Sequence, residues 1–334
     1  MDSVTQFVLG AAVTAAALGA RTRPLRAVCV GGFVGTLPDL DVLIDHGDAV
    51  ANMVSHRGFS HSLVWMTLAA PLLAWAIAAL LRELPVFRRW WLATWLALVT
   101  HALLDAMTIY GTRLLLPFEA QPFAVGSLFV IDPMFTLPLL VGTAALLVAR
   151  DRGRRWNTVG ITLAVAYAGA SLVLQQVATA AARRDLAARG LVVDRVVVTP
   201  APLQILLWRV IGLGEDHAHE GFWSPFDGRA IDFPAIDRGR ELRTVADGIP
   251  AWRRLVDFSG DCLKLERRGD ELRATDLRMG QEPHYVFSFV LATSTAGAWR
   301  PVAKPERSGA RPDVGRGLAW LWPRMWGADL PSPR

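Results

Sequence analysis

Histidine and aspartate residues stand near the ends of apolar segments in the first half of this 334-residue chain. They are Asp39 and Asp41 after Pro38, His56 and His61 around Arg57, the pair His101 and Asp105, and Asp132 before Pro133. Neutral imidazole and carboxylate together suit zinc, manganese, iron or nickel ions. His101 and Asp105 are four residues apart, so in a helix they share one face, one turn apart. The pattern indicates a metal site with enough donors for one or two ions.

Such a site is suited to hydrolysis. A catalytic ion keeps a position open for water and lowers the pKa of that water toward neutrality. Two ions about 3.5–4 Å apart could clamp both oxygens of a phosphoester displacement. A carboxylate outside the ligand set could orient a histidine or act as general base. Arg57 either contacts a phosphate through paired hydrogen bonds or only pairs with Asp45 or Asp48.

The elements that must position these residues are long apolar segments. A membrane helix needs about 20 mostly apolar residues. Four segments qualify well, namely residues 62–81, 90–109, 128–149 and 159–182. Residues 4–20 are shorter, and residues 27–44 form either a full span or a half-buried helix. We expect about six transmembrane helices, the first of them retained, because Met1-Asp2-Ser3 lacks the positive charge that opens a signal peptide.

Arginine-rich loops predict how this bundle is oriented in the membrane. Residues 21–26, 82–89 and 150–155 are basic, and with six spans they fall on one side, which the positive-inside rule makes cytoplasmic. The His and Asp residues then meet at the outer end of the bundle. Arg183 and Arg184 do not fit this orientation, because it places them on the outer side. Charged groups inside membrane segments are costly and by default mark function. The same topology accounts for the positive net charge, so we expect no nucleic-acid partner.

The long uncharged apolar segments end at about Arg183, and the residues after it are a mixture of apolar and charged types. We predict a transmembrane helical domain over residues 1–182, a small soluble α+β domain, mostly sheet, over 183–303 on the outer side, and a loose tail over 304–334. The expected strands cover residues 191–199, 203–213 and 286–291, with a fourth holding Trp223 and Phe226, and a helix covers 245–255. Cys29 and Cys262 form no metal or redox motif, and we expect no disulfide.

Six segments of the first 180 residues resemble the bacterial membrane-bound metal-dependent hydrolases of the YdjM type. They begin with Asp2-Ser3-Val4-Thr5-Gln6, Pro38-Asp39-Leu40-Asp41 and His56-Arg57-Gly58-Phe59-Ser60-His61-Ser62, and continue with His101-Ala102-Leu103-Leu104-Asp105, Thr108-Ile109-Tyr110-Gly111-Thr112 and Ile131-Asp132-Pro133. The family is distantly similar to zinc-dependent phospholipases C, which use His and Asp ligands on helices. The resemblance implies an inner-membrane hydrolase and leaves its substrate open.

By this resemblance the metal ligands are Asp39, His56, His61, His101 and Asp105, with Asp41 and Asp132 as further ligands or bases. Zinc is the expected ion, with manganese or iron as alternatives. The position of the His and Asp residues beside the bilayer, and not the resemblance, makes a phosphoester or lipid the expected substrate. Two other functions remain open. An ion-coupled transporter would use the intramembrane Asp105, although carriers bind near the midplane. A non-catalytic scaffold would use the soluble domain to bind a partner.

Overall fold

The fold comes from a computed structural model that describes residues 1–295, 297–309 and 313–333. The chain divides into two compact units. Unit 1 comprises Met1–Ile44, His56–Leu172 and Pro202–Gln204, and unit 2 comprises Asp45–Ser55, Val173–Ala201 and Ile205–Arg334. The first unit is helical and apolar, and the second is rich in sheet, which confirms the predicted order of the two kinds of structure.

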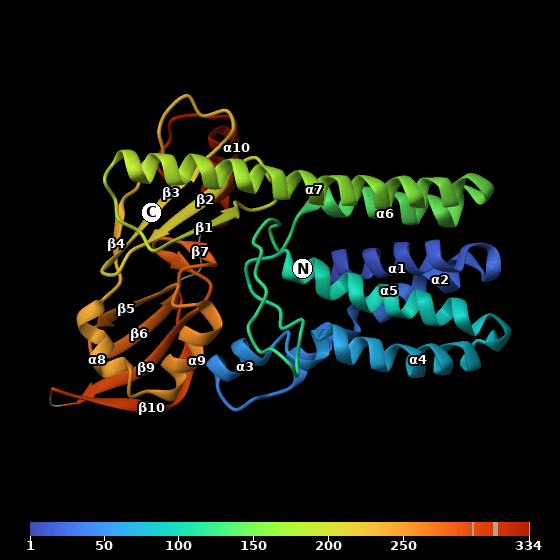
Figure 1. Cartoon of the computed structure of the whole chain (residues 1–334), viewed down its shortest axis with the longest axis horizontal. Coiled ribbons are helices and arrows are strands. Elements are labelled where there is room, and N and C mark those ends of the chain that lie inside the picture. Colours follow the sequence, from blue (N-terminus) through green and yellow to red (C-terminus); the bar gives the residue numbers. More distant parts are fainter. Residues whose placement is uncertain (296, 310–312, 334) are drawn as a thin grey trace. The chain divides into compact units, whose positions relative to one another are not determined.

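Unit 1 is built from helices that run back and forth beside one another (Figure 1). They are α1 (Ser3–Leu18), α2 (Pro24–Thr36), α4 (Leu63–Leu80), α5 (Phe87–Ala106), α6 (Pro133–Val148) and the first part of α7 (Arg150–Ala188). Short 3-10 turns connect or extend them: η1 (Gly19–Arg21), η2 (Leu37–Leu43), η3 (Phe59–His61) and η4 (Leu84–Val86). The basic connectors between α1 and α2, α4 and α5, and α6 and α7 therefore share one end of this unit.

Side-chain caps and prolines fix where these helices begin. The Asp2 carboxylate accepts hydrogen bonds from the backbone N–H groups of Val4 and Thr5 at the start of α1. Asp132 does the same for α6, where Pro133 occupies the first helical position, at which its missing N–H costs nothing. At the other end of α2, Pro38 cannot continue an α-helix, so the chain tightens into η2.

Small residues let α1 and α2 approach closely. A Cβ on Gly35 would lie 2.8 Å from the carbonyl oxygen of Gln6 and 2.9 Å from Cα of Gly10, so neither backbone leaves space for a side chain there. Alanines contribute to the core around this contact, among them Ala11 and Ala15 of α1 and Ala27 of α2. Close backbone approach through small residues is typical of helix packing in membranes, where packing replaces the hydrophobic effect.

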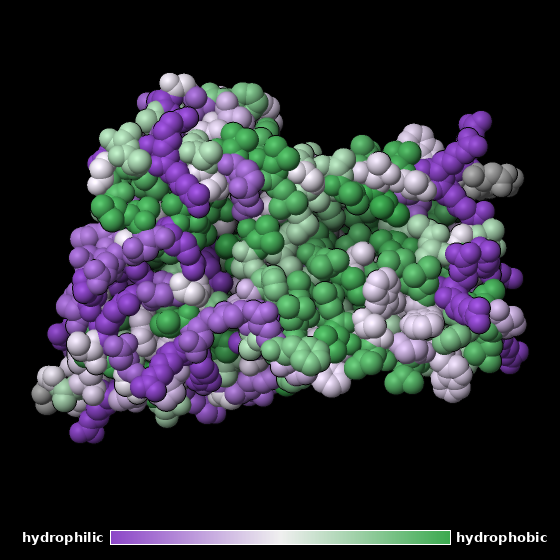
Figure 2. Space-filling model, in the orientation of Figure 1, coloured by the Kyte–Doolittle hydropathy of each residue, from purple (hydrophilic) through white to green (hydrophobic). Residues whose placement is uncertain are grey.

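Among the residues that the structure describes, three helical stretches are long and apolar enough to cross a membrane: Ser3–Arg21, Leu63–Leu80 and Arg152–Ala188. Helix α6 is also apolar but has 16 residues, and α5 carries Arg88, Arg89 and Asp105. Large apolar side chains of α4, such as Leu72 and Trp75, point away from the unit and are more than half exposed. Figure 2 shows the apolar surface of this helical part. The apolar helical region is confirmed, and six full crossings remain a prediction.

Unit 2 contains two antiparallel sheets of four strands. The first has the order β1-β2-β3-β4, with β1 Arg195–Pro200, β2 Trp208–Leu213, β3 His217–Trp223 and β4 Ala235–Asp237. The second has the order β10-β9-β6-β5, with β5 Leu263–Arg268, β6 Glu271–Asp276, β9 Ser288–Thr295 and β10 Ala298–Arg307. A two-stranded ribbon joins β7 (Gly280–Gln281) to β8 (His284–Tyr285). The predicted strands appear with shifted ends, and Phe226 lies outside β3.

Helices and buried ion pairs complete unit 2. The helices are α3 (Ala49–Ser55), α8 (Arg243–Ala246), α9 (Pro250–Ser259) and α10 (Val314–Met325), with the turn η5 (Arg240–Leu242). Arg209 pairs with Glu220 at 2.5 Å inside the domain. Both cysteines are free, and burial raises the pKa of the Cys262 thiol to about 11, so it is protonated at neutral pH.

Two segments differ from the expected domain plan. Residues 45–55, expected in a loop of the helical domain, include α3 (Ala49–Ser55) and belong to unit 2. Residues 304–334, expected to be loose, include the end of β10 and helix α10 within the described residues. Helix α10 is ordered by packing, because Leu321 and Met325 are buried with Phe222 and Leu207 in a hydrophobic cluster.

Candidate metal centre

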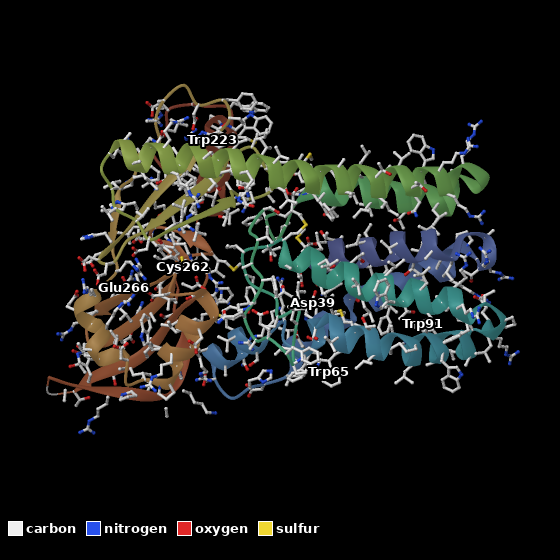
Figure 3. The ribbon with its side chains drawn as sticks, in the orientation of Figure 1. Asp39, Trp65, Trp91, Trp223, Cys262 and Glu266 are labelled. Carbon is white, nitrogen blue, oxygen red and sulfur yellow. The ribbon has the colours of Figure 1, made fainter. Side chains whose placement is uncertain are left out.

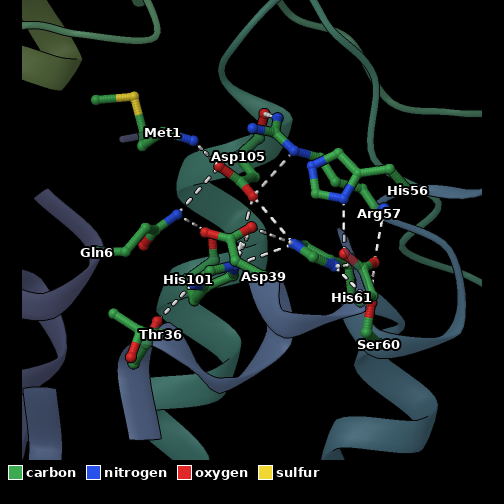
Figure 4. Close-up of polar contacts among 12 residues, drawn as sticks. Met1, Gln6, Thr36, Asp39, His56, Arg57, Ser60, His61, His101 and Asp105 are labelled. Atoms are coloured by element: carbon green, nitrogen blue, oxygen red, sulfur yellow. Dashed lines mark hydrogen bonds and ion pairs between the residues drawn. The ribbon is translucent and has the colours of Figure 1, made fainter. Parts of the chain in front are cut away.

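Two histidines and two aspartates of unit 1 meet at one point (Figure 4). Nε2 of His61 lies 3.0 Å from Nε2 of His101, 3.1 Å from Oδ2 of Asp105 and 3.4 Å from Oδ1 of Asp39. Nε2 of His101 lies 3.6 Å from the same Asp39 oxygen and 3.4 Å from Oδ2 of Asp105. This is the one group of such donors found in the part of the chain that the structure describes.

These separations lie close to the edge lengths of a small tetrahedron, and the two shortest fall slightly below them. Zinc binds imidazole nitrogen and carboxylate oxygen at about 2.0–2.2 Å, so tetrahedral ligands stand about 3.3–3.6 Å apart. Five of the six edges between the four atoms measure 3.0, 3.1, 3.4, 3.4 and 3.6 Å. Four converging donors at this spacing enclose a position that fits one divalent ion.

Hydrogen bonds on the far side of each imidazole set its tautomer. His101 donates from Nδ1 to the carbonyl oxygen of Gly35 at 2.6 Å, because a carbonyl can only accept. Ser60 donates its hydroxyl hydrogen to Asp41, so it accepts from Nδ1 of His61 at 2.8 Å. In their neutral forms both rings therefore turn an Nε2 lone pair toward the cluster. Two lone pairs 3.0 Å apart repel unless a metal ion or an additional proton lies between them, so the two rings are arranged as they would be in a metal site.

The two carboxylates have different surroundings. Asp105 is fully buried, and its Oδ1 receives the side-chain amide of Gln6 at 3.0 Å and the amino group of Met1. Nε of Arg57 lies 3.3 Å from its Oδ2. The side chain of Asp39 is 20% exposed, so the cluster opens to its surroundings beside this residue.

Local structure explains how the four side chains converge. His101 and Asp105 project from one face of α5, one turn apart, as their spacing predicts. Asp39 lies in the 3-10 turn that Pro38 imposes at the end of α2. His61 ends η3, directly before Ser62 caps α4. Figure 3 shows Asp39 at one end of the helices of unit 1 and Trp91, near the start of α5, toward the other end.

His56 and Asp41 form a pair beside the cluster. Nδ1 of His56 lies 2.6 Å from Oδ1 of Asp41, while the other carboxylate oxygen accepts hydrogen bonds from Ser60 and from the backbone N–H of Arg57. The predicted ligand His56 is therefore not among the four converging donors. Asp41 instead supports His61 through Ser60, one of the roles expected for a carboxylate outside the ligand set.

Asp132 has a different setting from the other predicted site residues. Its carboxylate caps α6 and accepts the hydroxyl of Tyr167 at 3.0 Å from both oxygens. It is not one of the four clustered donors. Capping and this hydrogen bond satisfy its charge locally, so the geometry gives it a structural role in holding α6.

Sequence reasoning missed the supporting residues Gln6 and Ser60 and the carbonyl group of Gly35. Gln6 was detectable in principle, because it is a fully buried amide within an apolar segment, where polar groups are expensive. The other two were not, because a backbone carbonyl carries no sequence signal and serine is common before helices.

Comparison with known proteins identifies a family model and two relatives that this chain resembles. The family model described as YdjM inner membrane protein matches residues 1–178, which include all four clustered donors. The uncharacterized protein YfhP of Bacillus subtilis (strain 168) is 28% identical over 181 residues, covering 52% of this chain and 55% of that protein. The inner membrane protein YbcI of Escherichia coli (strain K12) is 38% identical over 101 residues, covering 28% of this chain and 54% of that protein. The chain thus spans about half the length of these relatives, and no solved structure matches it.

Proposed function

Because the chain belongs to the YdjM inner membrane protein family, we propose that it is an integral membrane hydrolase that depends on one divalent metal ion. Asp39, His61, His101 and Asp105 would hold the ion. The observation that carries the proposal is the near-tetrahedral arrangement of four donors, two of them imidazoles whose lone pairs face each other. Nitrogen and oxygen donors at this spacing favour zinc, with manganese or iron as alternatives.

Hydrolysis requires that water reach the ion. A bound zinc ion would lower the pKa of water toward neutrality and polarise the bond to be cleaved. Four protein ligands complete a tetrahedron, and a closed tetrahedron is typical of structural sites. Catalysis therefore needs a fifth position or the release of one ligand. Asp39 fits that need, because it is the one partly exposed donor and lies on a short turn rather than on a long helix.

An apolar surface beside this opening supports a lipid phosphoester as substrate. Leu40, Val42, Leu43 and Ile44 follow Asp39 directly, and each is at least half exposed. An exposed apolar run of this kind marks a contact with a membrane or an apolar partner. A site that opens among such residues would receive an amphiphile from the bilayer more readily than a polar solute.

The metal content of the protein tests this proposal. We expect the full chain, purified in detergent without added metal, to contain about one equivalent of zinc and to hydrolyse a phosphoester substrate. A strong chelator should abolish the activity, and zinc should restore it. Absence of any bound transition metal before and after zinc addition would overturn the proposal. If zinc is bound but no phosphoester, carboxylic ester or amide substrate is hydrolysed, the ion has a structural role and not a catalytic one.

The positions of the basic connectors support an outward-facing site. Arg21, Arg23, Arg26, Arg88 and Arg89 lie at the end of the helices opposite the metal cluster. Basic loops stay in the cytoplasm. We therefore place the cluster and the C-terminal domain on the periplasmic side.

Reporter fusions check this orientation. We expect alkaline phosphatase fused after the last residue to be active and green fluorescent protein fused there to be dark, because the former folds only outside the cytoplasm. Fusions inserted after Leu84, in the connector between α4 and α5, should give the reverse pattern. A fluorescent C-terminal fusion would refute the orientation.

A further inference from the structure

Arg57 is a buried cation directly beside the proposed metal ligands. Its side chain is 5% exposed, and its Nε lies 3.3 Å from Oδ2 of Asp105. Nη1 donates to the hydroxyl of Thr108 at 3.0 Å, and the guanidinium lies 4.9 Å from the ring centre of Tyr110. A fixed positive charge next to a metal site weakens metal binding by repulsion. Its presence therefore calls for a reason other than holding the ion.

The chain holds this residue in an unfavourable backbone conformation. The φ angle of Arg57 is +61°, in the left-handed region that non-glycine residues rarely adopt. Its N–H donates to Asp41 at 3.0 Å, and its carbonyl accepts from the N–H of Arg113 at 3.0 Å. Both flanking peptide groups are thus fixed. Strained conformations of this kind persist where the surrounding structure enforces them, and they gather at functional sites.

One N–H donor of Arg57 has no hydrogen-bond acceptor among the described residues. The Nε–H is buried and makes no hydrogen bond within the described part of the chain, although it faces the cluster. A buried donor without an acceptor destabilises the folded state. An oxygen atom of a ligand that entered the site would satisfy this donor.

The charges of the site point to an anion as that ligand. Asp39 and Asp105 together balance the two charges of a divalent ion, and neutral imidazoles add none. Asp41, the next carboxylate, already accepts three hydrogen bonds from His56, Ser60 and the Arg57 backbone. The guanidinium of Arg57 and the amino group of Met1, which contacts Oδ1 of Asp105, together outweigh the single negative charge of Asp41, so the metal-loaded site keeps one excess positive charge in buried surroundings. A planar guanidinium beside a metal ion is well matched to the oxygens of a phosphate group.

We infer that Arg57 makes the metal-loaded site a receptor for a phosphate group, so that the substrate is a phosphate ester rather than a neutral ester or amide. This inference rests on the proposed metal-dependent function. Arg57 attracts the negatively charged group and positions it at the ligand cluster.

Binding measurements on the full chain in nanodiscs test the inference without relying on turnover. The variants are Arg57→Gln, Arg57→Lys and, as a control, Arg26→Gln, which removes an arginine paired with Glu83 at 2.8 Å at the other end of the helices. Zinc affinity is measured by competition with a chelating dye. Arg57→Gln should bind zinc at least as tightly as the original chain, because a repelling charge is gone. Arg26→Gln should not differ from it.

The second measurement is the affinity of each zinc-loaded protein for inorganic phosphate. Arg57→Gln should bind phosphate about 10- to 100-fold more weakly, the usual effect of losing a hydrogen bond to a charged group. Arg57→Lys should retain part of the affinity. Dihexanoyl phosphatidic acid binding more tightly than phosphate would identify a lipid as the source of the group. Equal affinities would identify a soluble phosphate ester.

The outcomes separate the two proposals. If the original chain binds no zinc, the metal-dependent function fails and this inference fails with it. If it binds zinc but the loaded protein binds no phosphate, or if Arg57→Gln binds phosphate as well as the original, only the role of Arg57 is refuted. A loss of zinc binding in Arg57→Gln with unchanged helical circular dichroism would show instead that the arginine supports the ligands, and would also refute it.

Discussion

Replacing Asp105 with Asn is expected to weaken zinc binding by the full-length chain by more than about 100-fold. Residues that merely orient a ligand contribute about 10- to 100-fold to metal affinity, and Asp105 supplies a donor atom itself. Asn keeps the shape of the side chain but removes the negative charge that faces both imidazoles at 3.1 and 3.4 Å. The measurement is competition with a chelating dye, together with the rise in unfolding temperature that added zinc produces.

Asp132→Asn is the matched control for this experiment. It makes the same chemical change at another fully buried aspartate that also stands at a helix end. Because Asn caps a helix about as well as Asp, its side-chain oxygen can still accept from the N–H groups of Met134 and Phe135, so this variant should fold with little loss of stability and leave zinc affinity unchanged. The prediction for Asp105 is refuted if both variants bind zinc as the original does. Equal weakening in both would show that general destabilisation, rather than a lost ligand, controls the affinity.

A single methyl group on Gly35 should have the second large effect. The Cβ of Gly35→Ala would stand 2.8 Å from the carbonyl oxygen of Gln6, closer than side chains are found to approach backbone. Overpacking of this kind typically costs about 1–3 kcal/mol. Pushing α1 and α2 apart would also displace Gln6 and the Gly35 carbonyl, which orient Asp105 and His101. We therefore expect lower thermal stability and weaker zinc binding together.

Gly169→Ala provides the comparison, because a Cβ at that position of α7 meets nothing within 4 Å. Alanine favours helix by up to about 1 kcal/mol over glycine, so this variant should be as stable as the original chain or slightly more stable. Thermal unfolding in the same detergent compares the two. Gly35→Ala with an unaltered unfolding temperature would contradict the close packing of α1 against α2.

The parts of the fold that sequence predicted are those fixed by local geometry. The apolar runs located the helices, and the four-residue spacing of His101 and Asp105 placed both on one face of α5. Helix ends shifted by a few residues, as at α6, because Asp132 and Pro133 decide where that helix starts. The joining of residues 45–55 to the C-terminal unit depends on contacts with α9 and β10, far away in sequence, so no local pattern could reveal it.

Within the site, the sequence indicated which residues could bind a metal ion, but it could not show which of them lie in the cluster. His56 and His61 look alike in the sequence, both beside helix ends. The left-handed turn at Arg57 separates them, and directs one toward Asp41 and the other into the cluster. That turn occurs at an arginine, a residue type that gives no sequence signal for a positive φ.

The facing imidazole nitrogens have a consequence for how this end of the molecule holds together. Gly35 and Ser60 fix both ring hydrogens on the outer side, so without a cation the helices that carry the rings experience a mutual electrostatic repulsion. The ion would then act as a cross-link among α5, η2 and η3, three pieces that are distant in sequence. Metal supply during membrane insertion would in that way govern the final assembly of the bundle as well as its chemistry.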